Sequence, residues 1–152
     1  MRKIFSFLLV IVLIFGFLPT DTYASVITEN RNIIAFEDGS YIEIVVEDVT
    51  ARATNTKNGY KTYTYYDSTD TAEWQAKLSA SFTYDGTNSS CNSASCTVTI
   101  YDSRWYEISN TTTKGGSTAT TALTMGRKFL GITISKPEYT ITLTCDKDGN
   151  LS

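Results

Sequence analysis

The sequence contains no histidine among its 152 residues. This absence excludes zinc–histidine sites, Ser–His and Cys–His nucleophile pairs, and proton transfer by histidine. Positive charge is scarce as well, with 13 Lys and Arg against 16 Asp and Glu and a formal net charge of −3. Because a nucleic-acid-binding surface needs clustered basic residues for the phosphates, this balance argues against a nucleic-acid partner.

Residues 1–24 have the pattern of a cleaved export signal. Two basic residues precede the uncharged run 4–18, Pro19 ends that run, and Thr22 and Ala24 place small residues before the cleavage point. The run is shorter than the ~20 residues that span a bilayer, so we expect cleavage, with an uncleaved anchor as the alternative. Residues 25–152 then form a secreted product without a membrane anchor, extracellular or loosely associated with the cell surface.

The rest of the chain alternates between apolar and polar residues with a period of two, which is typical of half-buried strands. The clearest case is 72–84, where one face carries Trp74, Ala76, Leu78, Ala80, Phe82 and Tyr84. Residues 96–100 and 139–145 repeat the pattern, and Leu130, Ile132 and Ile134 form a further apolar row. About eight strands and no helical segment predict one all-β domain, an antiparallel immunoglobulin-like sandwich with Trp74 and Trp105 in its core.

The chain has three cysteines, which allow one internal disulfide and one free thiol in an exported protein. Strand alternation points Cys96 and Cys145 into the core, whereas Cys91 lies in a polar loop. Alternation alone therefore favours a Cys96–Cys145 bond. A Cys91–Cys96 bond would close only a short loop and add little stability.

Four segments carry a resemblance to a known group of proteins: 82–87 (FTYDGT), 101–105 (YDSRW), 142–145 (TLTC) and 149–152 (GNLS). They resemble a group of small secreted proteins of Gram-positive bacteria that have no established activity, and the similarity extends over residues 61–152. In that group one cysteine follows the Phe-Thr-Tyr-x-Gly turn and another lies in the last strand. The resemblance therefore implies a Cys91–Cys145 disulfide and leaves Cys96 as a buried free thiol.

No catalytic template is complete in this sequence. A cysteine nucleophile lacks its histidine base, and the Gly115–Gly116 pair lacks the flanking pattern of a phosphate-binding loop. A pair of carboxylates could still cleave glycans, and Glu73, Glu107 and Glu138 are candidates by residue type alone. All three lie beside turns or at outward strand positions, where solvation is the simpler interpretation. We therefore expect a non-catalytic protein without a cofactor.

Two other clusters could bind a ligand. Asp146, Asp148 and Asn150 imitate the start of a calcium loop, but the distal glutamate is missing, so a polar turn without metal is favoured. Tyr63 and Tyr65 share one strand face, where exposed rings could stack on a sugar or contact a protein. The alternative is that these rings pack into the core.

These observations predict a non-catalytic extracellular or cell-surface binding or structural β-sandwich, whose partner, a surface glycan or a protein, the sequence does not identify. Two alternatives remain. One is a small secreted antibacterial or membrane-active effector, because the Ser/Thr-rich alternation of 77–83 and 118–124 is also found in pore-lining hairpins. The other is a carbohydrate-binding module.

Overall fold

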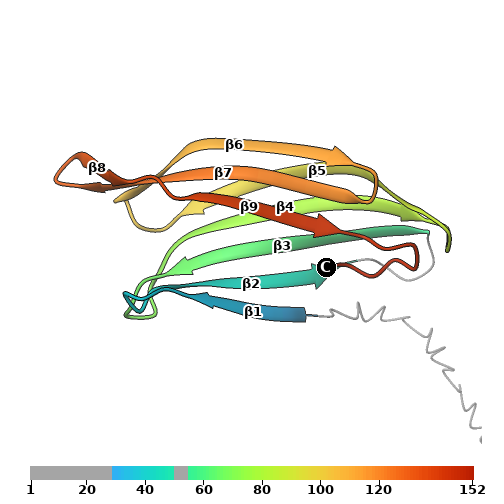
Figure 1. Ribbon diagram of the computed structural model, residues 1–152, viewed down its shortest axis with the longest axis horizontal. Helices are drawn as coiled ribbons and strands as arrows, with labels where there is room; N and C mark the ends of the chain where they lie inside the picture. The colour runs from blue at the N-terminus through green and yellow to red at the C-terminus, as the bar shows by residue number, and fades with distance from the viewer. Residues whose placement is uncertain (1–28, 50–54) are drawn as a thin grey trace, which may run out of the picture.

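The computed structural model describes residues 29–49 and 55–152, and the predicted export signal lies outside these residues. The described residues form nine strands and no helix. This part of the chain therefore contains no helix that is long and apolar enough to cross a membrane. The strands form two antiparallel sheets packed against each other, which confirms the predicted all-β sandwich (Figure 1).

The first sheet contains the first five strands in chain order: β1 (Glu29–Ala35), β2 (Tyr41–Asp48), β3 (Thr56–Tyr66), β4 (Ala72–Tyr84) and β5 (Ser89–Ile100). The second sheet contains β6 (Trp105–Gly115), β7 (Thr118–Phe129), β8 (Ile132–Ser135) and β9 (Glu138–Thr144). β8 pairs with the C-terminal end of β7, and β9 pairs with the part of β7 before it. Lys136 and Pro137 separate β8 from β9. In the first sheet, strands that follow one another in the chain are also neighbours, so this sheet is a meander. Immunoglobulin domains differ, because their strands are joined by Greek-key connections.

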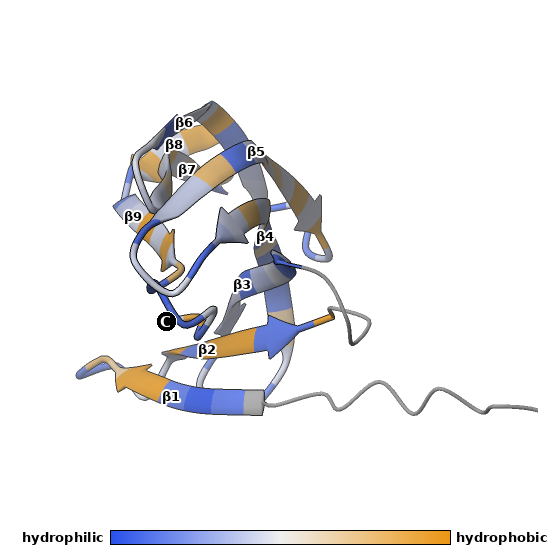
Figure 2. Ribbon diagram, turned by 90° about the vertical axis from the view of Figure 1, so that its right-hand side faces the viewer, coloured by the Kyte–Doolittle hydropathy of each residue, from blue (hydrophilic) through white to orange (hydrophobic). Residues whose placement is uncertain are grey.

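The core lies between the inward faces of the two sheets. Period-two alternation in β4 is confirmed, because Trp74, Ala76, Leu78, Ala80 and Phe82 are all buried. The second sheet contributes Ala119, Leu123 and Met125 from β7 and Ile141 and Leu143 from β9. Seen from the end, the first sheet curves from β1 up to β5 and the second sheet folds back over it (Figure 2).

The C-terminal residues return toward the first sheet after β9. Leu151 pairs with Cys145 in an isolated bridge and packs against Gly59 of β3, where even a Cβ atom would lie 2.2 Å from the leucine. Gly149 has a φ of +85° and lies against the ring of Tyr84. A side chain at either glycine would therefore push this segment away from the sandwich.

Candidate binding surface

The three cysteines are free thiols in the structure, with Cys91 and Cys145 buried and Cys96 half-buried. Cys91 is not in a loop as predicted but in β5, where the pairing with β4 shifts between Ser81 and Phe82. This bulge adds Asn92 to the strand, so that Cys91 joins the inward face together with Cys96. Strand alternation could not reveal this change of phase.

The structure brings Cys91 and Cys145 to the same turn. The backbone N–H of Cys91 donates to the carbonyl of Gly116 at 2.7 Å, and that of Cys145 donates to Ser117 at 3.0 Å. Burial is the main cause of the raised pKa of Cys145, and the neighbouring Cys91 thiol adds a small contribution. Burial also raises the pKa of Cys91 and of Cys96. All three thiols are therefore protonated and weakly nucleophilic at neutral pH.

The predicted ligand-contact tyrosines do not present exposed rings. Tyr65 is 7% exposed and packs against both Trp74 and Trp105, with ring centroids 5.8 and 5.1 Å away. Tyr63 packs partly buried against the core, and burial raises its pKa. The interpretation of these two residues as ligand contacts is corrected accordingly, because their strand face is the one that points inward.

The calcium-like segment after β9 is a turn closed on itself. The carboxylate of Asp146 accepts the backbone N–H groups of Asp148 and Asn150 at 2.9 and 2.8 Å, and the amide of Asn150 at 2.8 Å. These hydrogen bonds lower the pKa of Asp146. Asp148 turns instead to Lys147, 2.9 Å away. The described residues contain no group of three or more metal-binding acidic, cysteine or histidine side chains.

The three candidate glutamates are separated by their environments. Glu107 and Glu138 are exposed, whereas Glu73 is only 1% exposed. The expectation that Glu73 is solvated is therefore wrong. Its burial has a clear cause, because Arg104 in the loop after β5 and Trp105 at the start of β6 both donate to its carboxylate.

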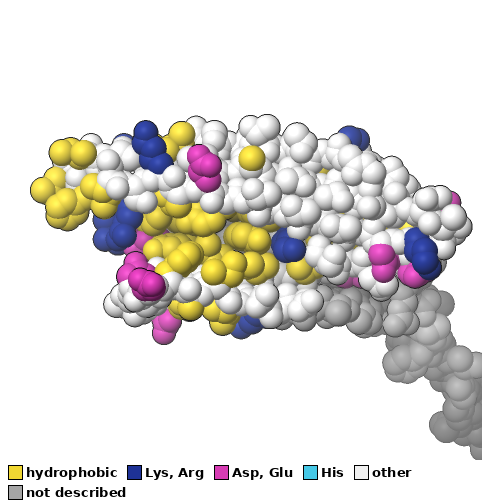
Figure 3. Space-filling model, in the orientation of Figure 1, with side chains coloured by type: hydrophobic (Ala, Val, Ile, Leu, Met, Phe, Trp, Pro, Cys, Tyr) yellow, Lys and Arg dark blue, Asp and Glu magenta, His cyan; other side chains and the backbone are white. Residues whose placement is uncertain are grey.

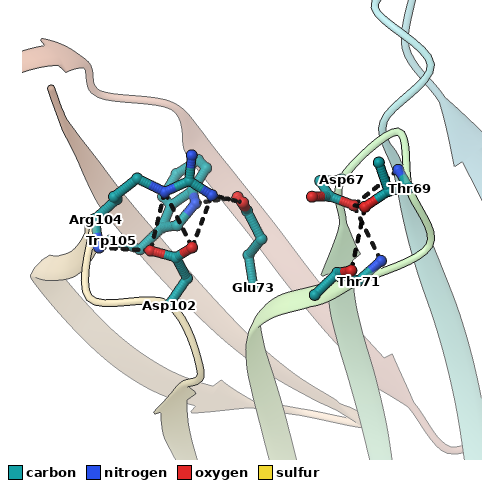
Figure 4. A network of polar contacts seen from close by, with 7 residues as sticks. All are labelled: Asp67, Thr69, Thr71, Glu73, Asp102, Arg104 and Trp105. Carbon is teal, nitrogen blue, oxygen red and sulfur yellow. Dashed lines mark hydrogen bonds and ion pairs between the residues drawn. The ribbon is translucent and has the colours of Figure 1, made fainter.

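Glu73 is the centre of a polar cluster at one end of the sandwich (Figure 4). One carboxylate oxygen accepts from the Arg104 guanidinium at 2.6 Å, and the other accepts from the indole N–H of Trp105. Arg104 also binds Asp102 at 2.7 Å, which lowers the pKa of the aspartate. The Asp67 turn lies next to this cluster but binds its own threonines, Thr69 and Thr71.

This cluster fixes the base of the hairpin formed by β7 and β8. The backbone carbonyl of Arg104 accepts from the N–H of Lys128 at 2.7 Å, and Trp105 pairs with Arg127 in the sheet. The Arg127 guanidinium lies 5.7 Å from the centre of the Trp105 ring. The loop 101–104 is thus tied to β4 through Glu73 and to β7 through Lys128.

The hairpin ends in a two-residue turn, Leu130 and Gly131, between the paired residues Phe129 and Ile132. Both turn residues have positive φ, +50° for Leu130 and +80° for Gly131, as a type I′ turn requires. Asn, Asp or Gly normally occupies the first of these positions, and a leucine there adopts a left-handed backbone that disfavours it. The conformation of the turn therefore does not explain why a leucine occupies position 130.

Four large apolar side chains are exposed at this end, and we call them the hairpin tip. The exposed fraction is 61% for Phe129, 87% for Leu130, 71% for Ile132 and 58% for Ile134. Phe129 continues the inward row of β7, which runs through Leu123 and Met125, but the hairpin extends beyond the turns of the first sheet (Figure 1). Its apolar face therefore has no opposing sheet.

The other face of the hairpin is held to β6 by Tyr106. Its hydroxyl lies 2.7 Å from the Thr133 hydroxyl, and its ring lies 4.5 Å from the Lys128 ammonium. Gly126 leaves room for this ring, because a Cβ atom there would be 2.3 Å from it. The hairpin is thus anchored on one face and uncovered on the other.

Positive charge surrounds the tip. The segment 127–136 contains Arg127, Lys128 and Lys136 and no acidic residue, in a chain whose net charge is −3. Figure 3 shows apolar side chains, in yellow, at the left end of the molecule and basic side chains, in dark blue, beside them. Glu138 is the first acidic residue after the segment, and Asp38 and Asp102 are within electrostatic reach of Arg127.

The sequence pattern predicts the apolar row of Leu130, Ile132 and Ile134 but not its exposure. The signal was present, because Leu-Gly occupies a two-residue turn and basic residues flank the row on both sides. No family model, curated protein or solved structure matches the chain.

Proposed function

We propose that the protein is an exported, non-catalytic β-sandwich that binds a component of the cell surface through its hairpin tip. The observation that carries this proposal is the exposure of four neighbouring large apolar side chains at the end of an anchored hairpin. Contiguous apolar surface on a soluble domain marks an interaction site, because leaving it in water is unfavourable. The left-handed Leu130 supports the same interpretation, since strained residues often serve a function.

The absence of catalytic chemistry in the described residues also favours a binding role. The buried carboxylate of Glu73 is saturated by Arg104 and Trp105, and burial keeps the thiols protonated. One surface hollow of the described chain, of about 350 Å³, is lined mainly by small and polar residues of β3, β4 and β5. None of these features supplies an activated nucleophile or a free acid–base pair.

We also propose that the exported protein carries a Cys91–Cys145 disulfide. The shared turn at Gly116 and Ser117 supports this pairing, because the backbone N–H groups of Cys91 and Cys145 bind adjacent carbonyls there. Export supports it further, because disulfides persist in oxidising compartments. Cys96, half-buried opposite Leu78, remains the free thiol.

The cell-surface proposal is tested with protein purified from the medium of cells that express the full chain. Fluorescently labelled protein is sedimented with intact cells of the producing organism, and Ile134→Thr is compared with Ile33→Thr. Ile33→Thr is the matched control, because Ile134 and Ile33 are 58% and 56% exposed but Ile33 lies on β1 of the other sheet. We expect Ile134→Thr to weaken cell binding about fivefold and Ile33→Thr to leave it unchanged.

Equal loss of binding in both variants would assign the interaction to general surface hydrophobicity. Unchanged binding in Ile134→Thr, with a second variant Ile132→Thr also unchanged, would remove the hairpin from the interaction and overturn the proposal.

A further inference from the structure

We infer that the surface bound by the hairpin tip is an anionic lipid membrane, which the tip enters to the depth of the headgroups. This inference rests on the proposed function and names its partner. The arrangement of charge and apolar side chains on the described hairpin carries it.

The tip has the shape required for entry into a bilayer. Leu130 is the outermost apolar residue at a turn only two residues long, and Phe129 and Ile132 stand beside it as a directly opposed pair. A narrow convex wedge of this kind needs a matching pocket to bind a protein. A lipid interface needs no pocket, because headgroups and acyl chains rearrange around inserted apolar side chains.

The backbone of the tip remains hydrogen-bonded during such an insertion. β8 pairs with β7 at Phe129↔Ile132, Lys128↔Thr133 and Arg127↔Ser135, with a bulge at Ile134, and the carbonyl of Arg104 binds the N–H of Lys128 at the hairpin base. Unpaired backbone groups are costly in an apolar medium, so a closed hairpin is a suitable inserting element. The two turn residues and the bulged Ile134 lie outside this pairing and would be near the headgroups, where water and phosphate are available.

The basic residues of the hairpin indicate that the lipid is anionic. Lys128 precedes the tip and Lys136 follows it, both exposed, and Arg127 lies one residue further back. Basic residues directly behind an apolar wedge lie at the level of lipid phosphates when the wedge is inserted. Each such residue near an anionic surface strengthens binding by about fivefold. Asp38 and Asp102 lie within electrostatic reach of Arg127, so the attraction of this end of the molecule to an anionic membrane depends mainly on Lys128 and Lys136.

The test uses the full exported protein and 100-nm vesicles of two compositions, pure phosphatidylcholine and a 70:30 mixture of phosphatidylcholine with phosphatidylglycerol. Co-sedimentation at low salt measures the partition coefficient. We expect binding to the anionic vesicles that is at least tenfold tighter than to the neutral ones and that weakens as salt is raised. Phosphatidylglycerol supplied as a soluble short-chain lipid should not compete, because the bilayer and not the free headgroup is the ligand.

The variants separate the apolar and the electrostatic contributions. Leu130→Asn should weaken vesicle binding about tenfold without loss of thermal stability, because Asn is favoured at this turn position. Lys136→Gln should weaken binding to anionic vesicles about fivefold and leave binding to neutral vesicles unchanged. Ile33→Thr should leave both unchanged.

Absence of vesicle binding by the unmodified protein would overturn the lipid inference. If Ile134→Thr still weakened cell binding in that case, the proposed function would stand and the partner would be a protein or a glycan. A tip-dependent dimer in analytical ultracentrifugation, without vesicle binding, would assign the tip to a second copy of this chain. Vesicle binding unaffected by Leu130→Asn and Lys136→Gln would also overturn the inference, because another surface would then carry it.

Discussion

Replacing Glu73 with alanine is expected to lower the free energy of unfolding by about 3 kcal/mol, a large share of the stability of a small domain. The substitution leaves the buried indole N–H of Trp105 without its acceptor and removes one of the two carboxylates that bind the Arg104 guanidinium, the other being that of Asp102. It also leaves a space at a position that is 1% exposed. Urea denaturation followed by tryptophan fluorescence measures the change.

Two variants show whether the buried carboxylate itself is responsible. Glu73→Gln keeps the shape and one acceptor for Trp105 but loses the charge, so its loss of stability should lie between those of the unmodified protein and Glu73→Ala. Glu107→Ala makes the same change at an exposed position of β6 and should lower the free energy of unfolding by less than about 0.5 kcal/mol. Equal losses in Glu73→Ala and Glu107→Ala would contradict the buried cluster.

Oxidation of Cys91 and Cys145 to a disulfide is expected to raise the free energy of unfolding by about 4 kcal/mol in the chain-entropy account, because the bond closes a loop of more than fifty residues. The two thiols lose two protons and two electrons, which a disulfide such as oxidised glutathione or an exported thiol oxidant accepts. Urea denaturation with and without reductant measures the difference. Peptide mapping without reductant identifies the bonded pair.

The cysteine variants assign the effect. Cys96→Ser should retain the response to reductant, whereas Cys145→Ser should abolish it and unfold like the reduced protein. Recovery of a Cys96–Cys145 peptide would contradict this pairing and restore the one that strand alternation favoured. A midpoint unaffected by reductant in the unmodified protein would show that no structural disulfide forms.

The sequence was sufficient to predict which residues share a strand face but not what covers that face. The row of β4 was assigned correctly because its alternation is unbroken from Trp74 to Phe82. Leu130 and Ile132 show the same alternation, yet they lie beyond the end of the opposing sheet and are exposed. Coverage depends on the relative lengths of strands in different sheets, which local periodicity does not contain.

Two other errors have the same physical origin, an interaction between distant parts of the chain. The bulge at Asn92 changes the phase of β5 and brings Cys91 inward, where alternation alone had placed it in a loop. Glu73 is buried because Arg104 and Trp105, about thirty residues further along, satisfy its carboxylate. A lone glutamate next to a turn gives no local sign of such partners.

Hydrogen exchange of the exported protein with and without isolated cell envelopes tests most directly whether the hairpin tip is the contact surface. Peptides that cover residues 127–136 should exchange more slowly when envelopes are present, while peptides from β2 and β3 of the first sheet should exchange at an unchanged rate. Slower exchange confined to β2 and β3, with residues 127–136 unchanged, would contradict binding through the hairpin tip and place the binding surface on the first sheet.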